Sequence, residues 1–232
     1  CALPISGGGV RYSLAEQQVA DLALRHNIPV VETIAGKGAF THYHPAHAGP
    51  IGIVGSTSAN ALASEADVIL AIGTRLQDFT TGSWTLFSRD AKFISINAAR
   101  WDAVKHRALS VVGDARETAE EVAQQLGSWE APADWFAYSR KLFGEWEALL
   151  ASHKKPSDAL IPTYAQVVDV INKGARDNDT LIAAAGGMPS ATNVATYPPS
   201  CAPTPKTKES PSTSTRASGS SITRSSSPAR QR

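Results

Sequence analysis

Asp67-Val-Ile-Leu-Ala-Ile-Gly73, followed by Thr74-Arg75, is the stretch that decides the fold class. Five consecutive apolar residues without alternation predict a strand that is covered on both faces, as in a parallel sheet. A helical pattern at 57–65 precedes this strand, and a second strand pattern at 92–97 follows it. The stretch therefore predicts part of an α/β fold, in which helices and parallel strands alternate.

The same alternation of strand and helix extends in both directions along the chain. Ser13 with Glu16, and Asp114 with Glu117, have the spacing of N-terminal capping boxes. The predicted helices are 13–26, 57–65 and 114–126, and the predicted strands are 2–6, 29–33, 67–73, 92–97 and 109–113. Short apolar strands joined by right-handed helical crossovers predict a doubly wound, Rossmann-like parallel sheet.

The chain changes character after this first unit, which we place at residues 1–128. We interpret 129–160 as an amphipathic linker helix, in which Trp135 and Trp146 are packing residues. Residues 161–188, with a helix at 164–173 and a strand at 179–185, predict the truncated start of a second α/β domain. Residues 189–232 are rich in Ser, Thr, Pro and Arg, which predicts a disordered tail.

Charge and cysteine content exclude several classes of protein. The formal net charge is +1, of which residues 198–232 contribute +5 and the preceding residues −4. A mildly acidic body gives no reason to expect a nucleic-acid partner. The two cysteines, Cys1 and Cys201, do not make a disulfide framework, and no apolar run approaches the ~20 residues that span a bilayer. We therefore expect a cytoplasmic protein with no membrane partner.

Candidate binding residues lie where the predicted strands end. Gly7-Gly8-Gly9 follows the first strand, and such a turn either brings a phosphate close to backbone amides or meets a steric need of the turn. Arg75 follows the central strand, where its guanidinium would bind a phosphate or pair with Asp78 to order the loop. Asn97 ends the next strand and would meet a ribose, although dinucleotide sites usually have an acid there. These residues predict a nucleotide-binding site at this edge of the sheet.

Two further motifs have competing interpretations. Gly36-Lys37-Gly38 has no phosphate-loop frame around it, which favours a role at a domain interface. His42, His44 and His47 fall within six positions, a spacing that suggests a metal site. No Cys or acidic residue stands beside them, and Pro45 and Gly49 favour an irregular surface or interface loop.

Three stretches together carry a resemblance that goes beyond fold class. They are Val31-Glu-Thr-Ile-Ala-Gly-Lys-Gly-Ala39 with His44-Pro45, Ala71-Ile-Gly-Thr-Arg-Leu-Gln-Asp-Phe-Thr-Thr-Gly82, and Phe93-Ile-Ser-Ile-Asn97 with its Ala-Ala-Arg continuation. In this order they resemble the central domain of thiamine-diphosphate enzymes. The Gln77-Asp-Phe-Thr-Thr-Gly-Ser-Trp84 segment is similar to the branch of that family that opens a cyclic dione in myo-inositol degradation. The resemblance covers about residues 3–188.

The resemblance implies what the parent enzyme would use. It would bind thiamine diphosphate and magnesium, cleave a carbon–carbon bond of a small cyclic dione, and assemble as a homodimer or homotetramer. Family members take an activating glutamate from their first domain and a Gly-Asp-Gly metal motif from their third. Neither has a match here, so the resemblance assigns no catalytic residue and no metal ligand. It places Gly186-Gly187 near thiamine diphosphate, and FAD or ADP occupies the central domain of some members.

These implications predict a piece of a larger hydrolase that does not turn over substrate by itself. The departure from the family pattern near 188–191 favours a reading-frame shift or a mis-joined exon. Three alternatives stay open at this point: part of an acetolactate-synthase-like enzyme, a non-catalytic nucleotide-binding module, and an oligomerisation element.

Overall fold

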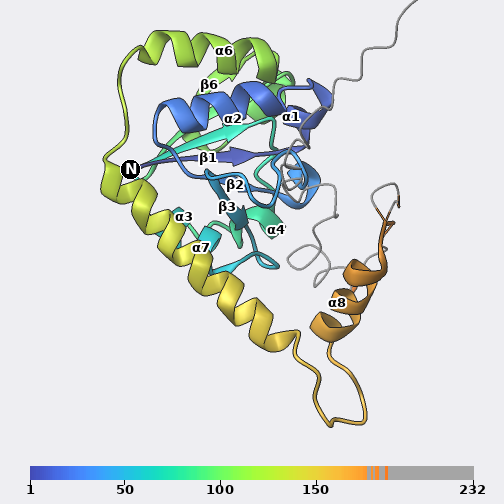
Figure 1. Ribbon diagram of the computed structural model, residues 1–232. Helices are drawn as coiled ribbons and strands as arrows, with labels where there is room; N and C mark the ends of the chain where they lie inside the picture. The colour runs from blue at the N-terminus through green and yellow to red at the C-terminus, as the bar shows by residue number, and fades with distance from the viewer. Residues whose placement is uncertain (177–178, 180, 183–185, 188–232) are drawn as a thin grey trace, which may run out of the picture.

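The computed structural model describes residues 1–176, 179, 181–182 and 186–187 (Figure 1). Most of the strand predicted at 179–185 and the whole tail predicted at 189–232 lie outside these residues.

The described part contains one sheet of parallel strands in the order β3-β2-β1-β4-β5-β6. This is the strand order of doubly wound dinucleotide folds, so the prediction of a Rossmann-like parallel sheet is confirmed. The order reverses between β1 and β4, which opens a crevice at the carboxyl ends of these two strands. The strands are β1 Ala2–Ser6, β2 Val30–Glu32, β3 His47–Pro50, β4 Val68–Ile72, β5 Lys92–Asn97 and β6 Leu109–Val112.

Helices cover both faces of the sheet, with α2 and α6 on one face and α3 and α7 on the other (Figure 1). The long helices are α2 Glu16–Arg25, α3 Thr57–Glu65, α6 Ala115–Leu126, α7 Ala133–His153 and α8 Tyr164–Gly174. Short helical turns follow several strands, at α1 Gly8–Tyr12, η1 Ile34–Gly36, α4 Asp78–Thr81, α5 Arg100–Ala103 and η2 Lys105–Arg107.

The central strand explains why this sequence forms a two-sided sheet. Ile69 and Ala71 of β4 are buried in the core under α3 and α7, whereas Leu70 and Ile72 are buried in the core under α2 and α6. Successive side chains of a strand point to opposite faces, so a continuous apolar run is what a doubly covered strand needs. The absence of alternation in β4 is thus explained by burial on both sides.

The start of the first predicted helix is wrong. The chain forms α1, breaks at Leu14 with a φ of +50°, and begins α2 after Ala15, which caps it without a side-chain hydrogen bond. Ser13 ends α1, and its hydroxyl instead hydrogen-bonds Asp114. The Ser13 side chain, which the local spacing assigned to a helix cap, therefore binds a residue from the other end of the domain.

Asp114, in contrast, caps α6 as the spacing predicts. Its carboxylate accepts hydrogen bonds from the backbone N–H of Arg116 at 2.8 Å and of Glu117 at 3.4 Å. The Ser13 hydroxyl, these backbone donors and the Arg116 charge together lower the pKa of Asp114, against the opposing effect of burial. The cap also ties α6 to the segment between α1 and α2.

The prediction of an irregular loop around His47 is also wrong. Residues 47–50 form β3 at the edge of the sheet, pairing with β2, and all four residues are buried. The register shifts between Val30 and Glu32, and Gly49 has a φ of +100°. A four-residue strand without an apolar run has no sequence signature, so only its partner strand reveals it.

Helix α7 crosses the face of the sheet that α3 covers and continues beyond it toward α8 (Figure 1). Trp135 is buried at its start, and the indole N–H donates a hydrogen bond to the Ala2 carbonyl at 2.9 Å. At the other end of α7, Trp146 and Leu150 pack against Val168 of α8. Thr163 and Gln166 form a capping box at the start of α8. The division of the chain into domains stays a prediction.

Candidate functional site

A cavity of about 670 Å³ opens at the carboxyl edge of the sheet, where the strand order reverses. We call it the switch-point cavity. Its volume is within the range of roughly 300–1,000 Å³ that is typical of small-molecule sites. The structure brings Gly8, Gly9, Arg75 and Asn97 together in its lining, although they lie far apart in the sequence. These four residues therefore border one concave surface, and their role in binding stays a prediction.

Two of the three glycines, Gly7 and Gly9, have a steric role beside this cavity. A Cβ atom at Gly7 would lie 2.4 Å from the Gly73 carbonyl oxygen, and one at Gly9 would lie 2.6 Å from the Gly73 Cα. Gly73 itself has a φ of +59°. The turns after β1 and β4 thus pack backbone against backbone, and this packing alone explains Gly7 and Gly9. A Cβ atom added at Gly8 would lie 3.3 Å from the Ala35 side chain, and Gly8 lines the cavity.

Arg75 is exposed and has a different partner from the one considered in the sequence. Its Nε lies 3.5 Å from Oδ2 of Asp102, whose other oxygen lies 2.5 Å from the Lys105 ammonium. These two cations hold the pKa of Asp102 below its usual range, chiefly through the Lys105 hydrogen bond and against the effect of burial. Asp78, which was the alternative partner, begins the short helix α4.

Asp102 is the residue of this cavity that sequence reasoning missed. It lies in α5, five residues beyond the end of β5, and it lines the cavity together with Arg75. A carboxylate at this edge is the group that accepts hydrogen bonds from ribose hydroxyls in dinucleotide sites. The signal available in the sequence was an acid shortly after a strand end, which is too common to single out.

Asn97 is occupied within the protein. Its amide nitrogen donates to the Thr74 carbonyl at 3.2 Å, and its oxygen accepts from the Ala99 backbone N–H at 3.0 Å. The side chain therefore joins the loops after β4 and β5 and orders the wall of the cavity.

The histidine cluster resolves into separate contacts. His47 Nε2 lies 3.2 Å from Oε2 of Glu32, and both side chains are buried, whereas His42 Nε2 lies 3.0 Å from Oε2 of Glu147 on α7. Burial acts to raise the pKa of Glu147. The hydrogen bond and charge of His42 outweigh this effect, so the pKa of Glu147 is lowered. Burial lowers the pKa of His44, aided by His47. No group of three His, Cys, Asp or Glu side chains in the described residues has a metal-binding arrangement.

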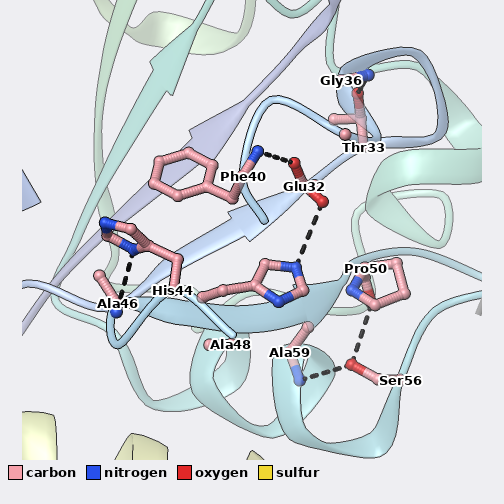
Figure 2. A network of polar contacts seen from close by, with 12 residues as sticks. Glu32, Thr33, Gly36, Phe40, His44, Ala46, Ala48, Pro50, Ser56 and Ala59 are labelled. Carbon is pink, nitrogen blue, oxygen red and sulfur yellow. Dashed lines mark hydrogen bonds and ion pairs between the residues drawn. The ribbon is translucent and has the colours of Figure 1, made fainter. Parts of the chain in front are cut away.

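Glu32 was overlooked in the sequence, although a charged residue inside the apolar strand pattern at 29–33 was a visible signal. Figure 2 shows its carboxylate at the end of β2, accepting a hydrogen bond from the Phe40 backbone N–H at 2.9 Å. The same carboxylate faces His47 on β3. It therefore joins β2, the loop that contains Gly36-Lys37-Gly38 and the edge strand.

Comparison with known proteins places this fold in a family. The model of the central domain of thiamine pyrophosphate enzymes matches residues 3–122. The chain belongs to the thiamine pyrophosphate enzyme family. The matched range runs from β1 into α6, so this central domain contains the sheet and the switch-point cavity.

Three relatives with the same name are similar to this chain. A 3D-(3,5/4)-trihydroxycyclohexane-1,2-dione hydrolase of Geobacillus thermodenitrificans is 35% identical over 211 residues, which cover 81% of this chain and 32% of the relative. Hydrolases of the same name from Clostridium perfringens and Listeria monocytogenes are 42% and 43% identical over 53% and 54% of the chain. The alignments span a third or less of the length of these relatives.

The described residues do not fit thiamine diphosphate by themselves. Gly187 lies against Tyr164, whose ring would be 2.8 Å from an added Cβ, and no described acidic cluster accompanies it to hold a metal ion. The full sequence also contains no Gly-Asp-Gly. The placement of Gly186 and Gly187 near the cofactor stays a prediction. In the described part, none of the helices combines the length and apolar character needed to cross a membrane.

Proposed function

We propose that this chain provides the central domain of an enzyme that opens the ring of trihydroxycyclohexane-1,2-dione in myo-inositol degradation. The observation that carries the proposal is the 35% identity to a hydrolase of that name over 81% of the chain. Cleavage would add water across a carbon–carbon bond and yield a deoxyglucuronate. Thiamine diphosphate and magnesium would supply the carbanion chemistry, as the family's cofactor does generally. The central domain would order the assembly rather than contact the reacting bond.

The purified chain is expected to show no dione cleavage with thiamine diphosphate and Mg²⁺, because its described residues offer no arrangement that fits either group. The measurement is product formation, with the Geobacillus hydrolase as the positive control. Turnover by the chain alone would contradict this part of the proposal.

A domain exchange tests the assignment itself. Residues 3–122 would replace the matching region of the Geobacillus hydrolase, and the chimera is expected to fold and cleave the dione. The matched control carries the central domain of an acetolactate synthase in the same place. If the control chimera cleaved the dione, and the chimera with residues 3–122 of this chain folded but did not, the acetolactate-synthase-like alternative would be favoured.

Nucleotide binding is a second candidate function, because Arg75 and Asp102 meet in one cavity of suitable size. Arg75 would contact a phosphate and Asp102 a ribose hydroxyl. Titration calorimetry with FAD, ADP and NAD is expected to detect binding of at least one of them. Arg75→Ala should weaken that binding about tenfold, the equivalent of ~1.4 kcal/mol. Arg25→Ala is the control, since Arg25 lies on α2 away from the cavity. No heat with any nucleotide would leave a purely structural cavity.

A further inference from the structure

A second pocket of about 640 Å³ lies at the other edge of the sheet, beside the first residues of β5 and β6. We call it the amino-edge pocket. It shares no lining residue with the switch-point cavity. Nothing in the proposed function uses this pocket.

The inner wall of the amino-edge pocket is aromatic. The Trp84 ring lies 5.2 Å from that of Phe93, 5.6 Å from that of Phe87 and 4.0 Å from that of His106, between centroids. Phe87 and Phe93 also meet edge to face at 5.1 Å. Burial and the Lys105 charge lower the pKa of His106. Since each ring is held by others, the wall is a rigid platform for a flat apolar group.

The rim of the same pocket is cationic. Arg89, Lys92 and Arg107 line it and are exposed. None of the ion pairs found among the described residues includes any of the three. A concave surface lined by charges of one sign concentrates ligands of the opposite sign. The rim therefore favours an anion.

Backbone strain converges on this pocket. Ser83 and Trp84 in one turn have φ of +52° and +66°, and His106 and Arg107 in the other have +59° and +56°. These are four of the seven non-glycine residues with positive φ in the described part of the chain. Such conformations are unfavourable for residues other than glycine, and they cluster at functional sites such as ligand clamps. The contact between Trp84 and His106 joins the two strained turns.

We propose that the amino-edge pocket binds a small organic anion with a flat ring, namely an aromatic phosphate or carboxylate. The ring stacks on Trp84, and the anionic group lies among Arg89, Lys92 and Arg107. Arginine binds both carboxylate and phosphate through paired N–H donors. The aromatic wall makes the pocket selective for anions that carry a ring over inorganic anions. The site is distinct from the nucleotide candidate, which uses Arg75.

Three probes separate the contributions of ring and charge. Titration calorimetry of the whole chain would use 1-naphthyl phosphate, 1-naphthol and inorganic phosphate. Naphthyl phosphate is expected to bind at least about tenfold more tightly than either of the others, because only it meets both the wall and the rim. Equal affinity for naphthol, or no heat from naphthyl phosphate, would refute the proposal. Phenyl phosphate against benzoate then distinguishes a phosphate site from a carboxylate site.

Variants locate the binding. Arg107→Ala and Lys92→Ala should each weaken naphthyl phosphate about tenfold, whereas Arg25→Ala should leave it unchanged. Arg107, Lys92 and Arg25 are exposed, so circular dichroism should show that their variants stay folded. If Arg75→Ala weakened the probe and the rim variants did not, the ligand would sit in the switch-point cavity and the proposal would fail.

Discussion

Replacing Glu32 by alanine is expected to destabilise the chain by about 3–5 kcal/mol, the cost of removing one member of a buried polar pair. Glu32 and His47 are 2% and 1% exposed. Without the carboxylate, the Phe40 N–H loses its acceptor and His47 loses the group 3.2 Å away. For a chain of this length each kcal/mol shifts the melting temperature by roughly 2–4 °C. Urea unfolding followed by circular dichroism measures the loss.

Two matched variants test the cause of that loss. Glu32→Gln keeps an oxygen for the Phe40 N–H and should be less damaging than Glu32→Ala. Glu145→Ala removes an exposed glutamate whose pair with Lys141 spans 3.9 Å, and it should change stability by no more than about 0.5 kcal/mol. A loss below about 1 kcal/mol for Glu32→Ala would contradict the view that this contact holds the edge strand.

Trp135→Ala should destabilise the chain by about 3–5 kcal/mol, as large core truncations do. Trp135 is 5% exposed and packs in the core between α7 and the sheet. Its loss also leaves the Ala2 carbonyl without the indole donor. Because α7 packs on α3 and β3, we expect this helix to loosen first. Hydrogen exchange of α7 amides and thermal unfolding are the measurements.

Two further tryptophan variants separate packing from hydrogen bonding. Trp135→Phe keeps most of the apolar contact and loses the N–H donor, so its cost should approach that of one hydrogen bond, about 0.5–1.5 kcal/mol. Trp101→Ala is the control, since Trp101 is 76% exposed, and its cost should be within about 0.5 kcal/mol. Equal losses for Trp101→Ala and Trp135→Ala would contradict the docking role of Trp135.

Much of the fold was predictable because its elements have local causes. The strand at β4 follows from a continuous apolar run, and the start of α6 follows from the capping chemistry of Asp114. The separation of strands by helices was enough to predict parallel order. β3 was not predictable, because its four residues become a strand only by pairing with β2.

The candidate site was predictable only in part. Strand ends in a parallel sheet converge, so Arg75 and Asn97 were expected at one edge before their positions were known. Their partners were not, since Asp102 reaches Arg75 only through the turn of α5, and Asn97 is satisfied by two neighbouring loops. Hydrogen bonds across loops depend on three-dimensional positions that spacing does not encode.

By itself, the sequence determined the family and the doubly wound sheet, since both follow from short contiguous segments whose chemistry is local. The tertiary structure alone decided which polar groups face each other. The apolar run at 67–73 required burial on both sides. It did not predict that the turn at Gly73 would pack against Gly7 and Gly9. It also gave no sign of the aromatic and cationic pocket at the opposite edge. Such contacts join residues that only the folding of the sheet brings together.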